Sequence, residues 1–350
     1  MQTSTLLRHL RLAALALALP IGLAAPALAD TSVKVVLNWK YEGPQGMFFL
    51  AQDRGYFKAE GIEPTFDQGN GSGAGVPLVA NGSYDIAFGD INALIQLAAN
   101  KPENAPVGVF MLYNRPPFTV AVKKDSPIRT PADFPGHLLG GAANDGALKL
   151  FPALCNVAKV DCTKVQITNM APNLREQMLM QGQVEGVFGY VNTIRFSARG
   201  MGVDADSQLR FIRYGDYGMD LYSNSIIVSH KLITEHPEVV KGFLRALVHG
   251  IKDAMADPKA AVESVSKREP LIKADVELAK FLATMRDEMS HPEIGKIGLG
   301  DVDDARMKTA IDILVKAQSL PTTPTTGQIF DRSLMPPKSD RPTSVPTGTM

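Results

Sequence analysis

Short apolar runs rich in β-branched residues alternate along the chain with longer amphipathic segments. Residues 33–37 and 62–66 have the composition of buried strands, and the segment 47–54 between them has a helical pattern. A third short run at 85–88 comes before a helical pattern over 93–99. Strands that alternate with helices predict βαβ units and a largely parallel sheet.

The same alternation occurs a second time and is followed by a helical region. Four further strands are predicted at residues 119–122, 138–141, 165–167 and 186–189. A strand at 226–229 then precedes segments that have helical patterns only. Two βαβ units with a late strand that returns to the first one indicate two lobes. We expect a discontinuous lobe 1 at 30–118 and 226–335, with lobe 2 inserted at 119–225.

Both ends of the chain differ from this α/β pattern. Residues 1–29 contain a basic cluster, an apolar run over 12–23 and an Ala-Leu-Ala motif ending at Ala29, which together are typical of a cleaved secretory signal. The alternative, a membrane anchor, needs about 20 apolar residues and fits less well. At the other end, residues 336–350 are rich in Pro, Ser and Thr, which predicts a disordered tail.

Composition limits the expected partners. The chain has 36 basic and 36 acidic residues, so no nucleic-acid partner is expected. Cys155 and Cys162 are the two cysteines of the chain. In an oxidising compartment we favour a disulfide between them, with two buried free thiols as the alternative. A zinc site would need about four ligands, and the Cys and His residues lack that spacing, so no metal is expected.

Several segments resemble a known family. The segment 46–62, Gly-Met-Phe-Phe-Leu-Ala-Gln-Asp-Arg-Gly-Tyr-Phe-Lys-Ala-Glu-Gly-Ile, is similar to the opening segment of NMT1/THI5-like substrate-binding proteins of ABC importers. Further matches lie at 78–89, 181–190 and 225–229. The resemblance covers about 33–335.

The resemblance implies a type II periplasmic-binding-protein fold, in which two α/β lobes joined by two crossover segments close over a ligand. It also implies a periplasmic protein that presents a small molecule to the membrane permease of an ABC importer. We expect a monomer without a cofactor. Members of the family bind thiamine-pyrimidine precursors, riboflavin-type compounds, alkanesulfonates, taurine, nitrate or bicarbonate, so the family alone does not define the ligand. A sensor subunit with the same fold is an alternative role.

Candidate ligand-binding residues follow the predicted strands, because ligands of open α/β sheets bind outside the carboxyl ends of the strands. The turns after the first three strands hold aromatic and polar side chains and a Gly-rich loop. Turns of lobe 2 and of the connecting segments add Asn, Asp and Tyr. The expected site comprises Asn38, Trp39, Tyr41, Gln45, Asn70, Ser72, Asp90, Asn92, Phe118, Asn144, Asp145, Tyr190, Asn192, Asp216 and Tyr217.

The chemistry of these residues favours a planar ligand. Trp39 and Tyr41 offer a stacking surface, although a Trp that covers the edge of the core is the alternative. Asp90 and Asn92 could equally cap a helix. Phe118 could equally belong to the core.

Few cations are expected at this site. Arg175 and Arg195 are assigned to a solvated surface, so a pyrimidine-like heterocycle is favoured over an alkanesulfonate, taurine or nitrate, which would need fixed positive donors. An enzyme similar to the pyrimidine-phosphate synthases is the alternative of another class. It is disfavoured because those enzymes have a Cys-rich cluster that this sequence lacks, and no export signal. The sequence also contains no GxSxG, HExxH or P-loop motif.

Overall fold

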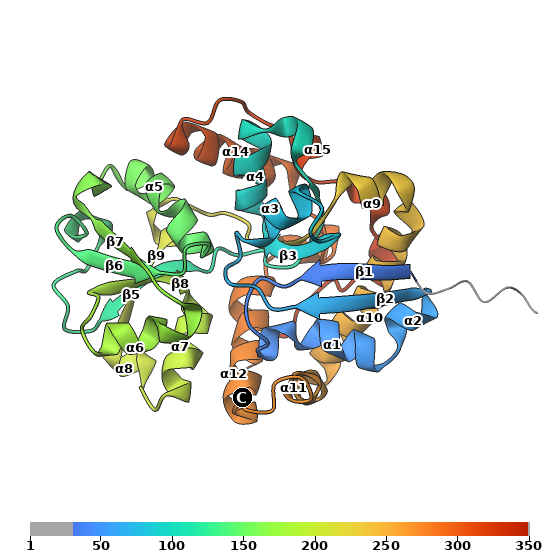
Figure 1. Ribbon diagram of the computed structural model, residues 1–350, viewed down its shortest axis with the longest axis horizontal. Coiled ribbons are helices and arrows are strands. Elements are labelled where there is room, and N and C mark those ends of the chain that lie inside the picture. Colours follow the sequence, from blue (N-terminus) through green and yellow to red (C-terminus); the bar gives the residue numbers. More distant parts are fainter. Residues whose placement is uncertain (1–30, 349–350) are drawn as a thin grey trace, which may run out of the picture.

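The computed structural model describes residues 31–348, which form two α/β lobes side by side (Figure 1). The strands of the first sheet are β1 (Thr31–Val36), β2 (Ile62–Asp67), β3 (Ile86–Asp90), β4 (Val107–Met111) and β10 (Asn224–Val228). Their order is β2-β1-β3-β10-β4. β1 is parallel to β2 and β3, whereas β10 is antiparallel to β3 and β4.

The second lobe contains a sheet of the same design. Its strands are β5 (Phe118–Lys123), β6 (Leu138–Gly141), β7 (Gln166–Asn169), β8 (Gly186–Tyr190) and β9 (Leu209–Arg213). Their order is β7-β6-β8-β5-β9. β6 is parallel to β7 and β8, and β5 is antiparallel to β8 and β9.

Two connecting segments, 112–117 and 214–223, pass between the two sheets. β10 therefore lies in the first sheet although it follows every strand of the second sheet in the chain. The two-lobed α/β fold expected from the sequence is confirmed. The sequence pattern did not predict β4 and β9, the strands that immediately precede the two connecting segments.

Helices cover the faces of both sheets (Figure 1). Those before the first connecting segment are α1 (Gly46–Asp53), α2 (Tyr56–Ala59), α3 (Gly75–Ala80) and α4 (Ile91–Asn100). Those of the second lobe are α5 (Gly146–Ala158), α6 (Arg175–Met180), α7 (Val191–Gly200) and α8 (Ala205–Gln208). Those after β10 are α9 (His230–Glu235), α10 (Pro237–Ala256), α11 (Pro258–Ser266), α12 (Ala274–Thr284), α13 (Glu293–Ile297), α14 (Asp304–Gln318) and α15 (Thr326–Ile329).

The core of the first lobe depends on a close crossing of α1 and α10. Val240, Phe243 and Leu244 lie on the buried face of α10, as the helical pattern predicts. At Gly250 the two helices approach so closely that a Cβ would lie 2.5 Å from the Cβ of Ala51. This packing fixes α1 and, with it, the turn that follows β1.

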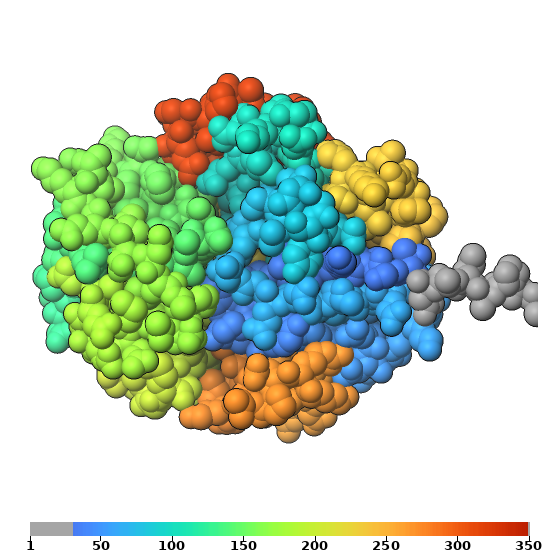
Figure 2. Space-filling view, in the orientation of Figure 1, coloured from blue at the N-terminus to red at the C-terminus, as the bar shows by residue number. Residues whose placement is uncertain are grey.

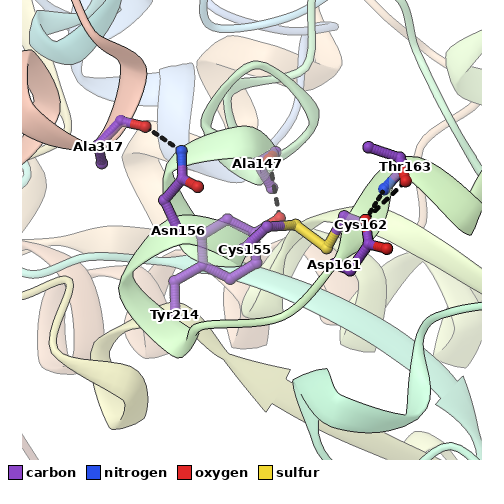
Figure 3. The surroundings of a disulfide bond; sticks show 8 residues. All are labelled: Ala147, Cys155, Asn156, Asp161, Cys162, Thr163, Tyr214 and Ala317. Atoms are coloured by element: carbon purple, nitrogen blue, oxygen red, sulfur yellow. Dashed lines mark hydrogen bonds between the residues drawn. A yellow bond between two sulfur atoms is a disulfide. The ribbon is translucent and has the colours of Figure 1, made fainter.

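Contacts between helices join the lobes outside the sheets. α14 lies against α5, where the side chain of Asn156 donates a hydrogen bond to the carbonyl of Ala317 (Figure 3). Figure 2 shows the second lobe in direct contact with segments of the first. α12 packs against α7 through an apolar cluster of Phe196, Val276, Ala279 and Ala283.

The two cysteines of the chain are joined to each other. Cys155 lies in α5, and its disulfide to Cys162 spans a sequence separation of 7 (Figure 3). Of the two alternatives that the sequence left open, the structure contains the disulfide. The bond ties the end of α5 to the segment that leads into β7.

The expectation of a disordered tail is wrong for residues 336–348. Arg341 is only 7% exposed, and its Nη1 donates to the carbonyl of Leu299 at 2.9 Å. The amide of Leu299 donates in turn to the carbonyl of Pro342 at 2.7 Å, and Val345 is buried. A segment rich in Pro and Ser is ordered here because backbone hydrogen bonds and a buried guanidinium hold it against the first lobe.

The expected signal at 1–29 lies outside the described residues. Within 31–348, no helix combines the length and the apolar character that crossing a membrane requires.

Candidate ligand-binding site between the lobes

A small cavity lies between the lobes, at the carboxyl ends of strands from both sheets. Its volume is about 20 Å³, roughly the space of one water molecule, so the lobes are closed on each other. All but one of the lining residues end a strand, lie in the segment after one or start the next helix, where α/β folds place their ligands; the exception, Thr193, lies in the first turn of α7. The lining residues are Asn38, Trp39 and Ser72 of the first lobe and Asp145, Arg175, Tyr190 and Thr193 of the second.

The Gly-rich loop after β2 allows this close approach. Gly71 has a φ of 145°, and a Cβ at this position would lie 2.3 Å from the carbonyl of Asn144. The amide of Gly73 donates to the same carbonyl at 3.0 Å. The loop of the first lobe therefore meets the turn after β6 backbone to backbone, and a side chain at position 71 would separate them.

Trp39 lies in the turn after β1 with its ring between the lobes. The residue is only 7% exposed. Its neighbour Asn38 is held by Gln45, whose side-chain amide donates to Asn38 Oδ1 at 2.7 Å. Among residues 31–348, the buried indole Nε1 of Trp39 has no hydrogen-bond partner. A buried donor without a partner is costly, so an acceptor on a ligand would be favourable here.

Arg175 is the main site residue that sequence reasoning missed. It was assigned to a solvated surface, but it is 1% exposed and lines the cavity. Its Nε and Nη2 donate to Glu176 Oε1 at 2.9 and 2.5 Å, and its Nη1 lies 3.6 Å from Asp145 Oδ2. The guanidinium carbon is 5.2 Å from the ring centre of Trp39. The assignment of Arg175 to a solvated surface is therefore wrong.

The charge of Arg175 is nevertheless matched within the protein. Burial alone would lower the pKa of Arg175, but Glu176 and Asp145 raise it, so the guanidinium is charged. Burial raises the pKa of the Asp145 carboxyl, and Arg175 opposes part of that increase. Of the three guanidinium nitrogens, Nη1 has the weakest hydrogen-bond contacts. It lies 3.6 Å from Asp145 Oδ2 and 3.4 Å from the carbonyl of Phe188.

Asp90 lies behind the cavity and acts as a helix cap. Its Oδ1 accepts hydrogen bonds from the backbone and side-chain nitrogens of Asn92 at 3.1 and 2.7 Å, at the start of α4. Burial raises the pKa of Asp90 to about 7, although these hydrogen bonds lower it. Its Oδ2 would lie 2.9 Å from a Cβ on Gly146, so the start of α5 packs directly against it.

Tyr190 and Phe118 connect the cavity to the second crossover. The hydroxyl of Tyr190 donates to Asn224 Oδ1 at 2.7 Å and lies 2.9 Å from Ser223 Oγ. Phe118 is fully buried and packs edge-on against Tyr190, with ring centres 5.5 Å apart. Phe118 is thus a core residue beneath the cavity. Tyr190 lines the cavity and also ties the second lobe to Ser223 and Asn224 through its hydroxyl.

A wider groove of about 370 Å³ lies beside the cavity and contains Tyr41, Glu42 and Glu176 in its lining. Glu176 connects the two spaces, because it also binds Arg175 of the cavity. On the groove wall, Lys280 Nζ lies 2.9 Å from Glu42 and 2.9 Å from Glu277. Burial alone would lower the pKa of Lys280, but the two carboxylates raise it. This part of the cleft is polar and internally charge-paired.

The structure does not bring the remaining predicted residues to the cavity. Asn70 and Asp216 are exposed, and Tyr217 is half-buried beside α5. Tyr41 lines the groove, and its hydroxyl donates to the Phe66 carbonyl at 2.5 Å.

The side chain of Asn192 lies at the edge of the interface between the lobes. It donates to Asp287 Oδ2 at 3.3 Å, on the segment that follows α12. Thr193 lines the cavity but was not predicted, because it lies inside α7 instead of in a strand-end turn.

The position of Arg175 in the chain could have identified it as a cavity residue. It starts α6, the helix that follows β7, and sequence reasoning used this placement to select the other candidates. Composition argued against it, because an Arg in a polar segment is more often solvated.

The fold and the placement of the cavity define the class: this chain has the periplasmic-binding-protein fold. Among solved structures, the alkanesulfonate-binding protein SsuA from Xanthomonas axonopodis pv. citri, bound to MOPS, matches with a TM-score of 0.65 and 12% identity. The match covers 87% of this chain and 99% of that chain. At this identity the likeness shows the fold alone.

The chain belongs to the NMT1/THI5-like family, whose model matches residues 45–261, more than half of its length. The riboflavin-binding protein RibY from Chloroflexus aurantiacus is 28% identical over 256 residues, 70% of this chain and 69% of the relative. The 4-amino-5-hydroxymethyl-2-methylpyrimidine phosphate synthase from Schizosaccharomyces pombe is 26% identical over 243 residues, 66% of this chain and 68% of the relative. The relatives therefore include both a binding protein and a synthase.

Proposed function

We propose that this chain is the periplasmic solute-binding component of an ABC importer and that it captures a small planar heterocycle between its lobes. The observation that carries the proposal is that two nitrogen donors of the cavity, Trp39 Nε1 and Arg175 Nη1, are underused. The hydroxyl of Ser72, which also lines the cavity without a partner among residues 31–348, adds a third polar group. Both nitrogen donors belong to groups that can stack on or lie against a flat ring. A ring with two acceptor atoms would satisfy both of these donors.

The closed cavity implies how such a ligand binds. Ligand sites usually have volumes of about 300–1,000 Å³, so the observed space of about 20 Å³ must widen before a ring can enter. Rotation about the connecting segments 112–117 and 214–223 would open it. A ligand that contacts Trp39 on one lobe and Arg175 on the other then favours the closed state, which we propose the permease recognises.

Arg175 also supports a second candidate, an anionic ligand such as an alkanesulfonate or nitrate. Against it, Arg175 already donates two hydrogen bonds to Glu176 and faces Asp145. A small anion would have to replace these contacts beside two buried carboxylates, and this repulsion is unfavourable. A neutral or cationic heterocycle with acceptor atoms meets no such repulsion.

A fluorescence titration tests the proposal directly, because Trp39 is the one Trp of the chain. Pyrimidines, flavins, alkanesulfonates and nitrate would be titrated while emission and melting temperature are recorded. We expect a heterocycle to change the emission and raise the melting temperature. If only sulfonates or nitrate do so, the heterocycle assignment is wrong, and if no compound does so, the solute-binding role fails.

Two variants separate stacking from general damage. Trp39→Ala should weaken the heterocycle by about 1–3 kcal/mol, whereas Trp39→Phe keeps an aromatic ring and should weaken it less. Mass spectrometry of the released ligand then distinguishes the binding role from the synthase alternative. A binding protein returns the ligand unchanged, and a converted product would favour the enzyme.

The export expectation has its own test. The mature protein from a periplasmic fraction should begin at Asp30, which intact-mass measurement would reveal. Recovery of the chain with residues 1–29 still attached in the cytoplasmic fraction would contradict a periplasmic role.

A further inference from the structure

A second groove lies beside the connecting segments and is rich in arginine. Its volume is about 530 Å³, and none of the residues that line the cavity lines this groove. Residues from several segments of the chain line the groove. Four arginines line it: Arg115 of the first connecting segment, Arg195 of α7, Arg213 at the end of β9, and Arg286 just after α12.

Two of these arginines are neutralised by neighbours. Arg286 donates from Nε and Nη2 to the carboxylate of Asp287, at 2.7 Å each. Arg195 donates from Nε to Asp206 Oδ1 at 3.1 Å. Their positive charges therefore add little to the potential of the groove.

The other two arginines carry uncompensated charge. In the part of the chain that the structure describes, neither Arg115 nor Arg213 forms an ion pair, and Arg115 Nε donates only to the carbonyl of Ser290, at 2.5 Å. Glu288 also lines the groove, but burial, together with Asp287, raises its pKa to about 8. Its carboxyl is thus mostly neutral at pH 7 and does not balance the two arginines.

We propose that this groove binds a phosphoryl dianion, as inorganic phosphate or as a phosphate monoester, through Arg115 and Arg213. Guanidinium groups present paired N–H donors that match the oxygens of a tetrahedral oxyanion, and two uncompensated positive charges match a dianion. The hydroxyl-bearing Thr347, which lines the same groove, adds a neutral donor. The anion would contact both lobes, since Arg213 belongs to the second lobe and Thr347 follows the first-lobe segment held by Leu299.

Isothermal titration of the purified chain tests this site at low ionic strength. Inorganic phosphate, glycerol phosphate and sulfate are titrated separately, which distinguishes a free phosphate site from one for a phosphate ester. We expect saturable binding with one site per chain. The double substitution Arg115→Gln and Arg213→Gln should weaken it by at least about tenfold, because charge-assisted hydrogen bonds are lost.

Arg199→Gln is the matched control. Arg199 is exposed on the same face of α7 as Arg195, but it does not line this groove. It should bind phosphate as the wild type does, and all variants should melt at similar temperatures without phosphate. Equal affinity in the double variant, or heat that never saturates at millimolar phosphate, overturns the proposal. A saturable change of Trp39 emission with phosphate would place the anion in the cavity and would also overturn it. This outcome would leave the solute-binding role intact.

Discussion

Replacing Arg175 by Met should destabilise the protein strongly, and more so at pH 8 than at pH 5. The substitution keeps much of the side-chain volume but removes a guanidinium from a position that is 1% exposed. Glu176 then loses hydrogen bonds of 2.9 and 2.5 Å, and Asp145 loses a cation 3.6 Å away. Both carboxyls remain buried, so the variant has acidic groups without a counter-charge.

The magnitude follows from the cost of leaving a buried charge unpaired. Breaking a buried ion pair by removing one partner costs about 3–5 kcal/mol. The guanidinium also lies 5.2 Å from the Trp39 ring, a contact worth about 1 kcal/mol. We expect the free energy of unfolding to fall by about 4 kcal/mol at pH 8, a large part of the roughly 5–15 kcal/mol of a typical protein.

The pH dependence has a defined sign. Burial raises the pKa of Asp145, and Arg175 lowers it, so removing Arg175 raises that pKa further. When a carboxyl has a raised pKa in the folded state, the free energy of unfolding falls as the pH rises from the unfolded pKa, about 4, through the folded pKa. The free energy of unfolding falls more for the variant than for the wild type over this interval, because the folded-state pKa of Asp145 is higher in the variant. Its deficit should therefore shrink towards acidic pH.

Urea unfolding at pH 5 and pH 8 measures both effects. Arg199→Met is the control, because Arg199 is exposed in the same lobe and should change the stability by less than about 0.5 kcal/mol. A deficit below about 1 kcal/mol at pH 8 would mean that the buried pair contributes little. A deficit of equal size at both pH values would show that the loss comes from packing and not from the orphaned carboxyls.

Three further predictions concern other parts of the site and fold. Asp90→Asn should flatten the stability profile between pH 4 and pH 7. Because the pKa of Asp90 is raised to about 7, this carboxyl alone contributes a loss of about 1.4 kcal/mol per pH unit over that interval; an unchanged slope in urea unfolding contradicts this. Substituting both Cys155 and Cys162 by Ser should lower the free energy of unfolding by about 2–3 kcal/mol, because the disulfide restricts the conformations of the unfolded chain. Identical unfolding midpoints with and without the bond would refute this reasoning. Gly71→Ala should weaken ligand binding while the fold is kept, because its Cβ would lie 2.3 Å from the Asn144 carbonyl in the closed state; unchanged affinity would show that closure does not need this contact.

Much of the fold could be predicted because its signals are local. The β-branched runs at 33–37 and 62–66 correspond to β1 and β2, and the apolar stripe of α10 packs inward. β9 gave a weaker signal, because Leu-Arg-Phe-Ile-Arg lies at a sheet edge and carries charged side chains. The ordered tail could not be predicted, since its stability comes from the contact between Arg341 and Leu299 and not from its composition.

The lining of the cavity was predictable where position alone decides and unpredictable where burial depends on the opposite lobe; that a ligand binds there stays a prediction. Asn38, Trp39, Ser72, Asp145 and Tyr190 were identified because they follow strands, and all of them line the cavity. The sequence around Arg175 is that of a polar helix start, and nothing local distinguishes it from a solvated one.

The error about Arg175 changes the argument for the ligand but not its direction. A shortage of cations was the original reason to favour a heterocycle, and the buried guanidinium removes that reason. What replaces it is the state of the guanidinium: Nε and Nη2 are committed to Glu176, and only Nη1 remains weakly bonded. The other free donors of the cavity, the Nε1 of Trp39 and the hydroxyl of Ser72, are unpaired within residues 31–348 and belong to neutral groups. One weakly bonded N–H of a charge-paired guanidinium is too little for a sulfonate, whose three oxygens share one negative charge. Two separate donors on stacking groups are instead suited to a ring with two acceptor atoms, and so the geometry of satisfied and unsatisfied hydrogen bonds supports the heterocycle more directly than composition did.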